Sequence, residues 1–282
     1  MLPRLTRARA PLTQEVEVLD EHGQQQRVAI PAERDLTIYV DKRELVTLMT
    51  LGAHPEWLVL GYLRNQRLVR SVEEVESVTV DWEVSSAAVR TRTGITGIEE
   101  RTARRIVTTG CGQGSVFGAL MDEVASLRLP AAVLRQEALY GILEAIRHQE
   151  STYKSAGSVH GCALFRGSEM LLFVEDVGRH NAIDTIAGWM WMQGLSAQDT
   201  PADQPFVFYT TGRLTSEMVI KSAQMGVAIV VSRSGMTQMG HQVAQQLGLC
   251  TVGRALNRRF LCYTGAERLL MQTSDRQAAA PG

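Results

Sequence analysis

The stretch Phe206-Val-Phe-Tyr-Thr-Thr-Gly-Arg-Leu-Thr-Ser-Glu217 decides the fold class, because an apolar strand passes through a turn into the start of a helix. The same order follows directly: residues 227–231 form a second apolar run, and helical spacing returns over residues 238–247. Strands made of continuous Val, Ile and Phe are typical of a sheet that helices cover on both faces. The sequence therefore predicts an α/β protein.

The flanking segments extend this pattern into a core that we assign to residues 128–270. Its further predicted elements are helices over residues 130–149 and 182–192, and strands over residues 159–165, 170–174, 250–253 and 260–263. Residues 271–282 end in Ala-Ala-Ala-Pro-Gly and are expected to form a disordered tail.

The N-terminal part divides into an arm and a smaller lobe. Residues 1–30 are polar with little periodicity, so we expect a flexible arm with at most a short strand over residues 15–18. Residues 31–127 are assigned to an α+β lobe that ends in a cysteine-containing loop. Its predicted elements are a hairpin over residues 36–49, a helix that begins at Pro55, and strands over residues 75–82 and 87–92.

Composition excludes several classes of protein. The 282 residues carry a formal net charge of -1, so the protein lacks the overall positive charge that would predict binding to nucleic acid. No apolar run is long enough to span a bilayer, and the N-terminal arginines are followed by no apolar block that would make a secretory signal. The four cysteines show no close pairing, which predicts a reduced, cytoplasmic protein.

The loop Thr108-Thr-Gly-Cys-Gly-Gln-Gly-Ser115 is the first candidate for chemistry. Around Cys111, the residues Gly110, Gly112 and Gly114 lack a Cβ atom, and Gln113 lies between the last two, so another molecule could approach the thiol closely. A helix is predicted to follow, and its N-terminal dipole would favour the thiolate. A structural turn with an unreactive thiol is the alternative.

A second candidate lies at the junction of a predicted strand and helix, where open α/β sheets bind their ligands. Here Arg179 could bind a phosphate, His180 could move a proton, and Asn181 could contact a base edge or a carbonyl. A solvated turn with a helix cap is the alternative explanation.

Two further strand ends repeat this design, one with Gly212-Arg213 and one with Ser232. Each could also be an ordinary helix cap, but together they predict an anion site for a phosphate-bearing ligand such as a nucleotide. The segment from Arg254 to Arg259 contains three arginines and could add to this site, or it could be a basic solvated turn.

A metal site is not predicted. A zinc deaminase would require His-x-Glu followed by a cysteine pair, whereas the sequence His160-Gly-Cys162 has Cys162 at the position of the glutamate and no cysteine pair after it.

These segments resemble the FdhD/NarQ family, the formate dehydrogenase accessory sulfurtransferases. The resemblance covers residues 35–264, and its most specific part is Glu175-Asp-Val-Gly-Arg-His-Asn-Ala182. The Thr-Thr-Gly-Cys-Gly loop, Ser158-Val-His160 and the Thr-Gly-Arg-Leu-Thr-Ser-Glu stretch occur in the same order as in the family.

The resemblance implies a cytidine-deaminase-like three-layer α/β/α core without zinc, in a homodimer. It implies a sulfur carrier between a cysteine desulfurase and the catalytic subunit of formate dehydrogenase. Cys111 would carry sulfur as a persulfide and transfer it to a molybdenum bis-guanine-dinucleotide cofactor, for which GDP is a mimic of one half. The implied guanine-nucleotide site comprises Arg254, Ala255, Leu256, Asn257, Arg258 and Arg259.

One position departs from the family pattern. Many relatives carry Cys-x-x-Cys in the loop, but Gly114 stands at the second cysteine position. Either Cys111 alone suffices, or Cys162 acts as its partner, although an ordinary buried thiol is the better explanation of Cys162. The rival function is a chaperone that binds and delivers the cofactor without covalent sulfur chemistry.

Overall fold

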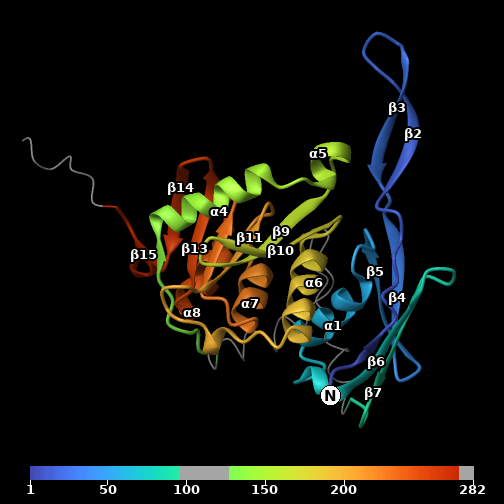
Figure 1. Ribbon diagram of the computed structural model, residues 1–282, viewed down its shortest axis with the longest axis horizontal. Helices are drawn as coiled ribbons and strands as arrows, with labels where there is room; N and C mark the ends of the chain where they lie inside the picture. Colours follow the sequence, from blue (N-terminus) through green and yellow to red (C-terminus); the bar gives the residue numbers. More distant parts are fainter. Residues whose placement is uncertain (96–126, 273–282) are drawn as a thin grey trace, which may run out of the picture.

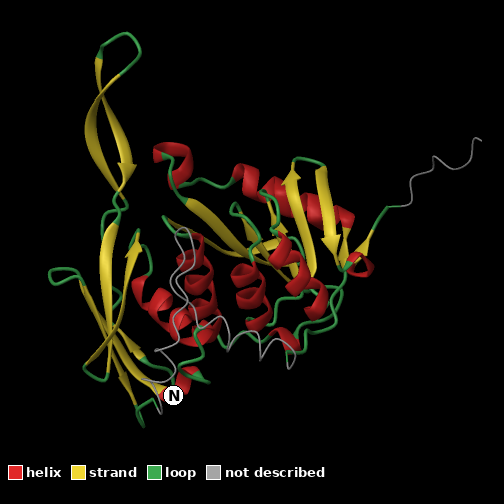
Figure 2. Ribbon diagram, turned by 180° about the vertical axis from the view of Figure 1, so that it is seen from behind, coloured by secondary structure: helices red, strands yellow, loops and turns green. Residues whose placement is uncertain are grey.

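The computed structural model describes residues 1–95 and 127–272 (Figure 1). Two sheets, each packed against helices, stand side by side and are joined by a contact between two of these helices (Figure 2). The larger sheet has the strand order β10-β9-β11-β12-β13-β14. Its strands are β9 (His160–Arg166), β10 (Glu169–Asp176), β11 (Phe206–Thr210), β12 (Ile229–Ser232), β13 (Cys250–Leu256) and β14 (Arg259–Thr264).

Helices cover both faces of the larger sheet. The helices α6 (Arg179–Met192), α7 (Ser216–Gln224) and α8 (Gln238–Leu247) bury their apolar side chains with Leu164 and Phe208 of the sheet. On the other face, α4 (Gln136–His148) packs on side chains such as Phe165 and Val231. The predicted α/β class is therefore confirmed, and its cause is the one read from the sequence: β11 and β12 are buried along their whole length.

The smaller sheet has the order β1-β6-β7-β4-β5 and packs against one helix, α1 (Pro55–Asn65). Its strands are β1 (Arg4–Leu5), β4 (Arg34–Val40), β5 (Arg43–Thr50), β6 (Val75–Asp81) and β7 (Ser86–Thr91). The predicted hairpin, helix start and strand pair of this lobe are all confirmed. The other face of α1 lies against α6, so α6 is enclosed by the larger sheet on one side and α1 on the other.

The short strand expected over residues 15–18 is present, but the segment before Pro31 has more regular structure than predicted. The strands β2 (Thr13–Leu19) and β3 (Gln25–Pro31) pair along their full length and form a hairpin that projects from the body (Figure 1). Its signal in the sequence is weak, because the few apolar residues, such as Val16 opposite Val28, are separated by charged and polar ones.

Two predicted helix boundaries also differ from the structure. The helix expected from residue 130 begins at Gln136, because β8 (Leu134–Arg135) pairs with β15 (Leu269–Leu270) instead. The helix expected from residue 182 begins at Arg179, directly after the N-cap residue Gly178. The remaining short elements are α5 (Thr152–Ala156), η1 (Val72–Glu74), η2 (Ala197–Asp199) and η3 (Ala266–Arg268).

Some predictions fall outside the described residues. These are the cysteine loop with its flanking strand and helix, within residues 96–126, and the tail over residues 273–282. Among the helices of residues 1–95 and 127–272, none has the length and apolar character needed to cross a membrane.

Candidate functional site

An open pocket of about 250 Å³ lies at the edge of the larger sheet where β11 and β12 end. Tyr209 and Thr211 line it from the end of β11, and Arg233 follows β12. The tip of the β13–β14 hairpin, residues 255–257, closes another side. Open α/β sheets bind ligands at this edge, so we take this hollow, the strand-end pocket, as the candidate site.

The strand-end pocket is rich in positive charge. Arg147, Lys154 and Arg233 line it, and Glu175 is the only carboxylate among its described lining residues. Glu175 is already engaged, because its oxygens accept hydrogen bonds from the backbone amides of Thr152 and Tyr153 at the start of α5. Arg147 is paired with the exposed Glu144, so Lys154 and Arg233 are the cations that most favour an anionic ligand. Arg147 and Lys154, which reach the site from α4 and α5, were not predicted, because neither residue follows a strand of the sheet.

Hydrogen bonds fix the loop after β11. The Thr210 hydroxyl accepts from the Gly212 amide at 3.0 Å, and the Ser232 hydroxyl donates to the Gly212 carbonyl at 2.6 Å. Ser232 is fully buried, so its hydroxyl holds the loop rather than lining the pocket. Arg213 is exposed and also lies outside the pocket lining. Gly212 and Ser232, which were predicted to bind the ligand, therefore stabilise the loop after β11 instead.

The predicted binding segment, residues 254–259, is the hairpin between β13 and β14. Ala255, Leu256 and Asn257 line the strand-end pocket, and Asn257 has a left-handed φ of 55° at the turn. The arginines lie elsewhere: Arg258 packs over the Tyr140 ring in the neighbouring hollow, with 5.6 Å between the guanidinium carbon and the ring centroid. Arg254 and Arg259 are exposed and do not line the pocket. The segment is brought to the site, but the pocket's positive charge comes from other residues.

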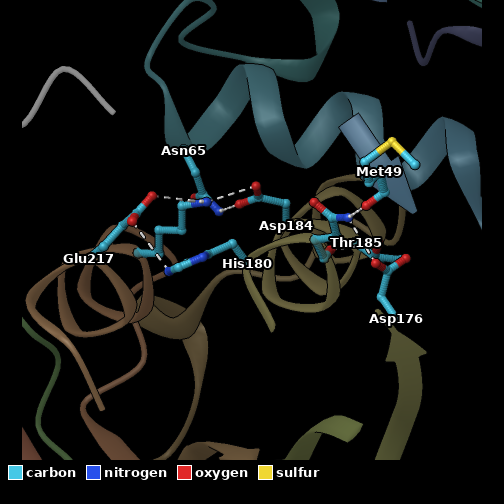
Figure 3. A network of polar contacts seen from close by, with 9 residues as sticks. Met49, Asn65, Asp176, His180, Asp184, Thr185 and Glu217 are labelled. Carbon is cyan, nitrogen blue, oxygen red and sulfur yellow. Dashed lines mark hydrogen bonds and ion pairs between the residues drawn. The ribbon is translucent and has the colours of Figure 1, made fainter. Parts of the chain in front are cut away.

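Asn181 ties the two halves of the protein together. Buried Asp176 accepts hydrogen bonds from the Thr50 hydroxyl at 2.5 Å, from the Asn181 amide at 2.8 Å and from two backbone amides. The same Asn181 amide donates to the Met49 carbonyl at 2.6 Å (Figure 3). These contacts fasten the end of β5 to the start of α6. Asn181 is therefore occupied with packing and does not line the strand-end pocket.

His180 belongs to a buried charged network between α6 and α7 (Figure 3). Its Nε2 lies 3.2 Å from Oε2 of Glu217, whose Oε1 is 3.9 Å from Nζ of Lys221. Lys221 Nζ is in turn 2.8 Å from Oδ2 of Asp184, which accepts at Oδ1 from the Asn65 amide at 2.7 Å. Burial raises the pKa of both carboxyl groups, and the charge of Lys221 opposes this. The burial of Asp184, Glu217 and Lys221 could not be predicted, because charged residues in a helix are usually exposed.

Arg179 lies against the loop after β11. A Cβ atom on Gly212 would be 2.8 Å from Cδ of Arg179, so the glycine allows this close contact. Burial lowers the pKa of the neighbouring His160, and the positive charges of Arg179 and Arg213 lower it further. Arg179 and Arg213 therefore make the surroundings of His160 positive, and its neutral imidazole is favoured. This positive region adjoins Gly161 and Thr211 of the strand-end pocket.

The described cysteines differ sharply in reactivity. Cys162 is fully buried and donates to the Thr210 hydroxyl at 3.3 Å, and burial raises its pKa to about 12. Cys250 is also buried, whereas Cys262 is only half-buried, and its interaction with Cys250 lowers the pKa of Cys262. Cys111 and the loop residues Gly110, Gly112, Gln113 and Gly114 lie outside the described residues. The expected absence of zinc stays a prediction.

Comparisons with known proteins identify the family of the chain. The model of the FdhD/NarQ family matches residues 31–270. The sulfur carrier protein FdhD of Bacillus subtilis is 30% identical over 235 residues, which cover 83% of this chain and 87% of the relative. The protein of the same name from Halalkalibacterium halodurans is 28% identical over 93% of this chain and 96% of the relative.

A solved structure has the same fold. It is the crystal structure of a protein described as a formate dehydrogenase accessory protein from Desulfotalea psychrophila, with a TM-score of 0.72 and 24% identity. The match covers 92% of this chain and 100% of the solved one. With the family model matching most of its length and a curated relative at 30% identity, the chain belongs to the FdhD/NarQ family.

Proposed function

We propose that this protein is a sulfur carrier that supports formate dehydrogenase. The observation that carries this proposal is the family match over residues 31–270, together with relatives named sulfur carrier protein FdhD. Sulfur would come from a cysteine desulfurase, and the recipient would be the molybdenum bis-guanine-dinucleotide cofactor of the formate dehydrogenase catalytic subunit.

In the proposed reaction, the Cys111 thiolate attacks the outer sulfur of the desulfurase persulfide. The S–S bond of that persulfide breaks, the desulfurase cysteine leaves as a thiolate, and the sulfur remains on Cys111 as a new persulfide. A thiol releases this sulfur as sulfide by attacking the inner sulfur of the persulfide, which leaves that thiol in a disulfide with Cys111, and a second thiol then restores Cys111. Cys162 is a poor candidate for that thiol, because it is buried with a raised pKa. We therefore propose a single loop cysteine and an external thiol reductant.

The strand-end pocket is the proposed site for a guanine nucleotide half of the cofactor, with GDP as its mimic. Arg147, Lys154 and Arg233 supply charge for the phosphates, and residues 255–257 supply the turn at the other side. Arg179 and Arg213 extend the positive region next to the pocket. We further propose a cytidine-deaminase-like core without zinc, a homodimer and a cytoplasmic location, as the family resemblance implies.

The second candidate is a chaperone that binds and delivers the cofactor without covalent sulfur chemistry. One observation favours it: Gly114 stands where many relatives have the second loop cysteine.

Mass spectrometry of the intact protein after incubation with a cysteine desulfurase and cysteine separates the two. The carrier predicts a mass increase of one sulfur atom that maps to Cys111, is absent in Cys111→Ala and persists in Cys162→Ala. No adduct, with GDP binding intact, would contradict the carrier and leave the chaperone. An adduct on Cys162 would show that the reactive thiol is misassigned.

A further inference from the structure

A second hollow, of about 390 Å³, lies at the other edge of the larger sheet, where α1, α6 and α7 end. Since α6 starts near the strand-end pocket and is 14 residues long, the two hollows are about 20 Å apart. Arg64, Arg67 and Arg70 line it together with Trp191, and none of its described lining residues is acidic. We call it the arginine pocket.

Arg64 is a half-buried cation, and no ion pair with a described carboxylate balances its charge. Its Nη1 donates to the Ala187 carbonyl at 2.9 Å, and its guanidinium carbon lies 5.1 Å from the centroid of a Trp191 ring. Burial alone lowers the pKa of Arg64 to about 10, and no carboxylate of the described residues opposes this. Removing a cation from water without a counter-ion is unfavourable, so an anion bound here would be stabilising.

The backbone at the end of α1 gives a second indication. The helix closes with the Leu68 amide donating to the Leu63 carbonyl at 2.9 Å, and Arg67 takes the left-handed position with φ of 54°. Glycine is usual at this position, because other residues are strained there. The backbone therefore holds Arg67 at the pocket wall, where its Nε lies 3.1 Å from the side-chain amide of Gln224, another lining residue.

We infer that the arginine pocket binds an oxyanion of the phosphate class, either free or as part of a nucleotide. The flat guanidinium groups of Arg64 and Arg70 suit two-point binding of phosphate oxygens. The chain as a whole has a net charge of -1, so a general positive field does not explain the site. This inference does not rest on the proposed sulfur transfer, because the binding involves no sulfur chemistry.

The test is isothermal titration of the full-length protein with inorganic pyrophosphate. Arg70 is exposed, so Arg70→Gln should fold normally. We expect this variant to bind pyrophosphate about tenfold more weakly, because it loses one charged hydrogen bond. Arg64→Lys, which keeps the charge but loses the flat fork, should also weaken binding. The matched control is Arg135→Gln, which removes an equal charge at an exposed position outside the pocket and should bind as the wild type does.

Because the strand-end pocket is also positive, the same titration is made with Arg233→Gln. Pyrophosphate binding that survives in Arg233→Gln but weakens in Arg70→Gln supports the inference. GDP is then titrated into Arg233→Gln. If GDP binds this variant more tightly than pyrophosphate does, the ligand is a nucleotide. If the two affinities are equal, the ligand is a free anion. The inference is overturned if Arg70→Gln binds pyrophosphate as tightly as the wild type does. It is also overturned if Arg233→Gln abolishes all pyrophosphate binding.

Discussion

Gly61 of α1 and Gly188 of α6 face each other where the two halves of the protein meet, and neither position has room for a side chain. A Cβ atom on Gly61 would lie 1.6 Å from the backbone oxygen of Asp184, and one on Gly188 would lie 1.9 Å from that of Trp57. The helix backbones are therefore in direct contact. This contact holds the middle of α6 against α1 of the N-terminal lobe.

The substitution Gly61→Ala should destabilise the protein by about 2 kcal/mol or more, because the added methyl group must force the two helices apart. The measurement is the midpoint of urea unfolding. Gly235→Ala is the matched control, since a Cβ atom there meets no heavy atom within 4 Å. Equal unfolding midpoints for the two variants would show that the helices do not meet as described.

Lys221→Met should cost about 3 kcal/mol or more of unfolding free energy, because it leaves the Asp184 carboxylate buried without its cation. Arg27→Met removes one partner of the exposed Arg27–Glu17 pair and should cost less than about 1 kcal/mol. The double variant Lys221→Met with Asp184→Asn should recover much of the loss. If it does not, the loss arises from packing of the lysine chain and not from the charge.

These two contacts show which part of the fold could not be predicted from the sequence. The strands β11 and β12 were predictable, because runs of Val, Ile and Phe are buried wherever a sheet is covered on both faces. The contact of Gly61 with α6 was not, because a glycine within a helix does not indicate which distant helix approaches it. Lys221 has the spacing of an ordinary helical lysine, and its partner Asp184 lies 37 residues earlier.

The candidate site also contains some residues that the sequence could predict and others that it could not. Thr211, Arg233 and residues 255–257 follow strands, so the rule for ligand sites at strand ends could find their region. Arg147 comes from α4 and Lys154 from α5, and only tertiary packing brings these helices to the pocket.

Cys262 should be the most readily alkylated of the three described cysteines. The thiolate is the reactive form, and the interaction with Cys250 lowers the pKa of Cys262, so Cys262 should react with iodoacetamide at a lower pH than an ordinary thiol. Cys162, with a pKa raised to about 12 by burial, should react only after unfolding. Peptide mass spectrometry after timed labelling reports each site separately. Faster labelling of Cys162 than of Cys262 in the folded protein would contradict this order.

His160 should make the protein less stable in acid. Burial and the charges of Arg179 and Arg213 lower its pKa in the folded state below the unfolded value of 6.5. The neutral His160 therefore makes its full contribution to the free energy of unfolding above pH 6.5, and this contribution is lost as the pH falls through the pKa of the folded state. The melting temperature of His160→Gln should fall less than that of the wild type between pH 8 and pH 5. His22→Gln, at an exposed histidine, is the control and should follow the wild type.

Arg233 and Arg213 give a direct test of which arginine serves the candidate site. The sequence predicts Arg213, whereas the structure places Arg233 in the lining of the strand-end pocket and leaves Arg213 outside it. Arg233→Gln should weaken GDP binding about tenfold, the loss of one charged hydrogen bond to a phosphate, and Arg213→Gln should weaken it less. Equilibrium titration with GDP at constant ionic strength is the measurement, because both variants lose the same charge and differ only in its position. A larger loss in Arg213→Gln would move the nucleotide from the pocket to the positive region around Arg179 and His160.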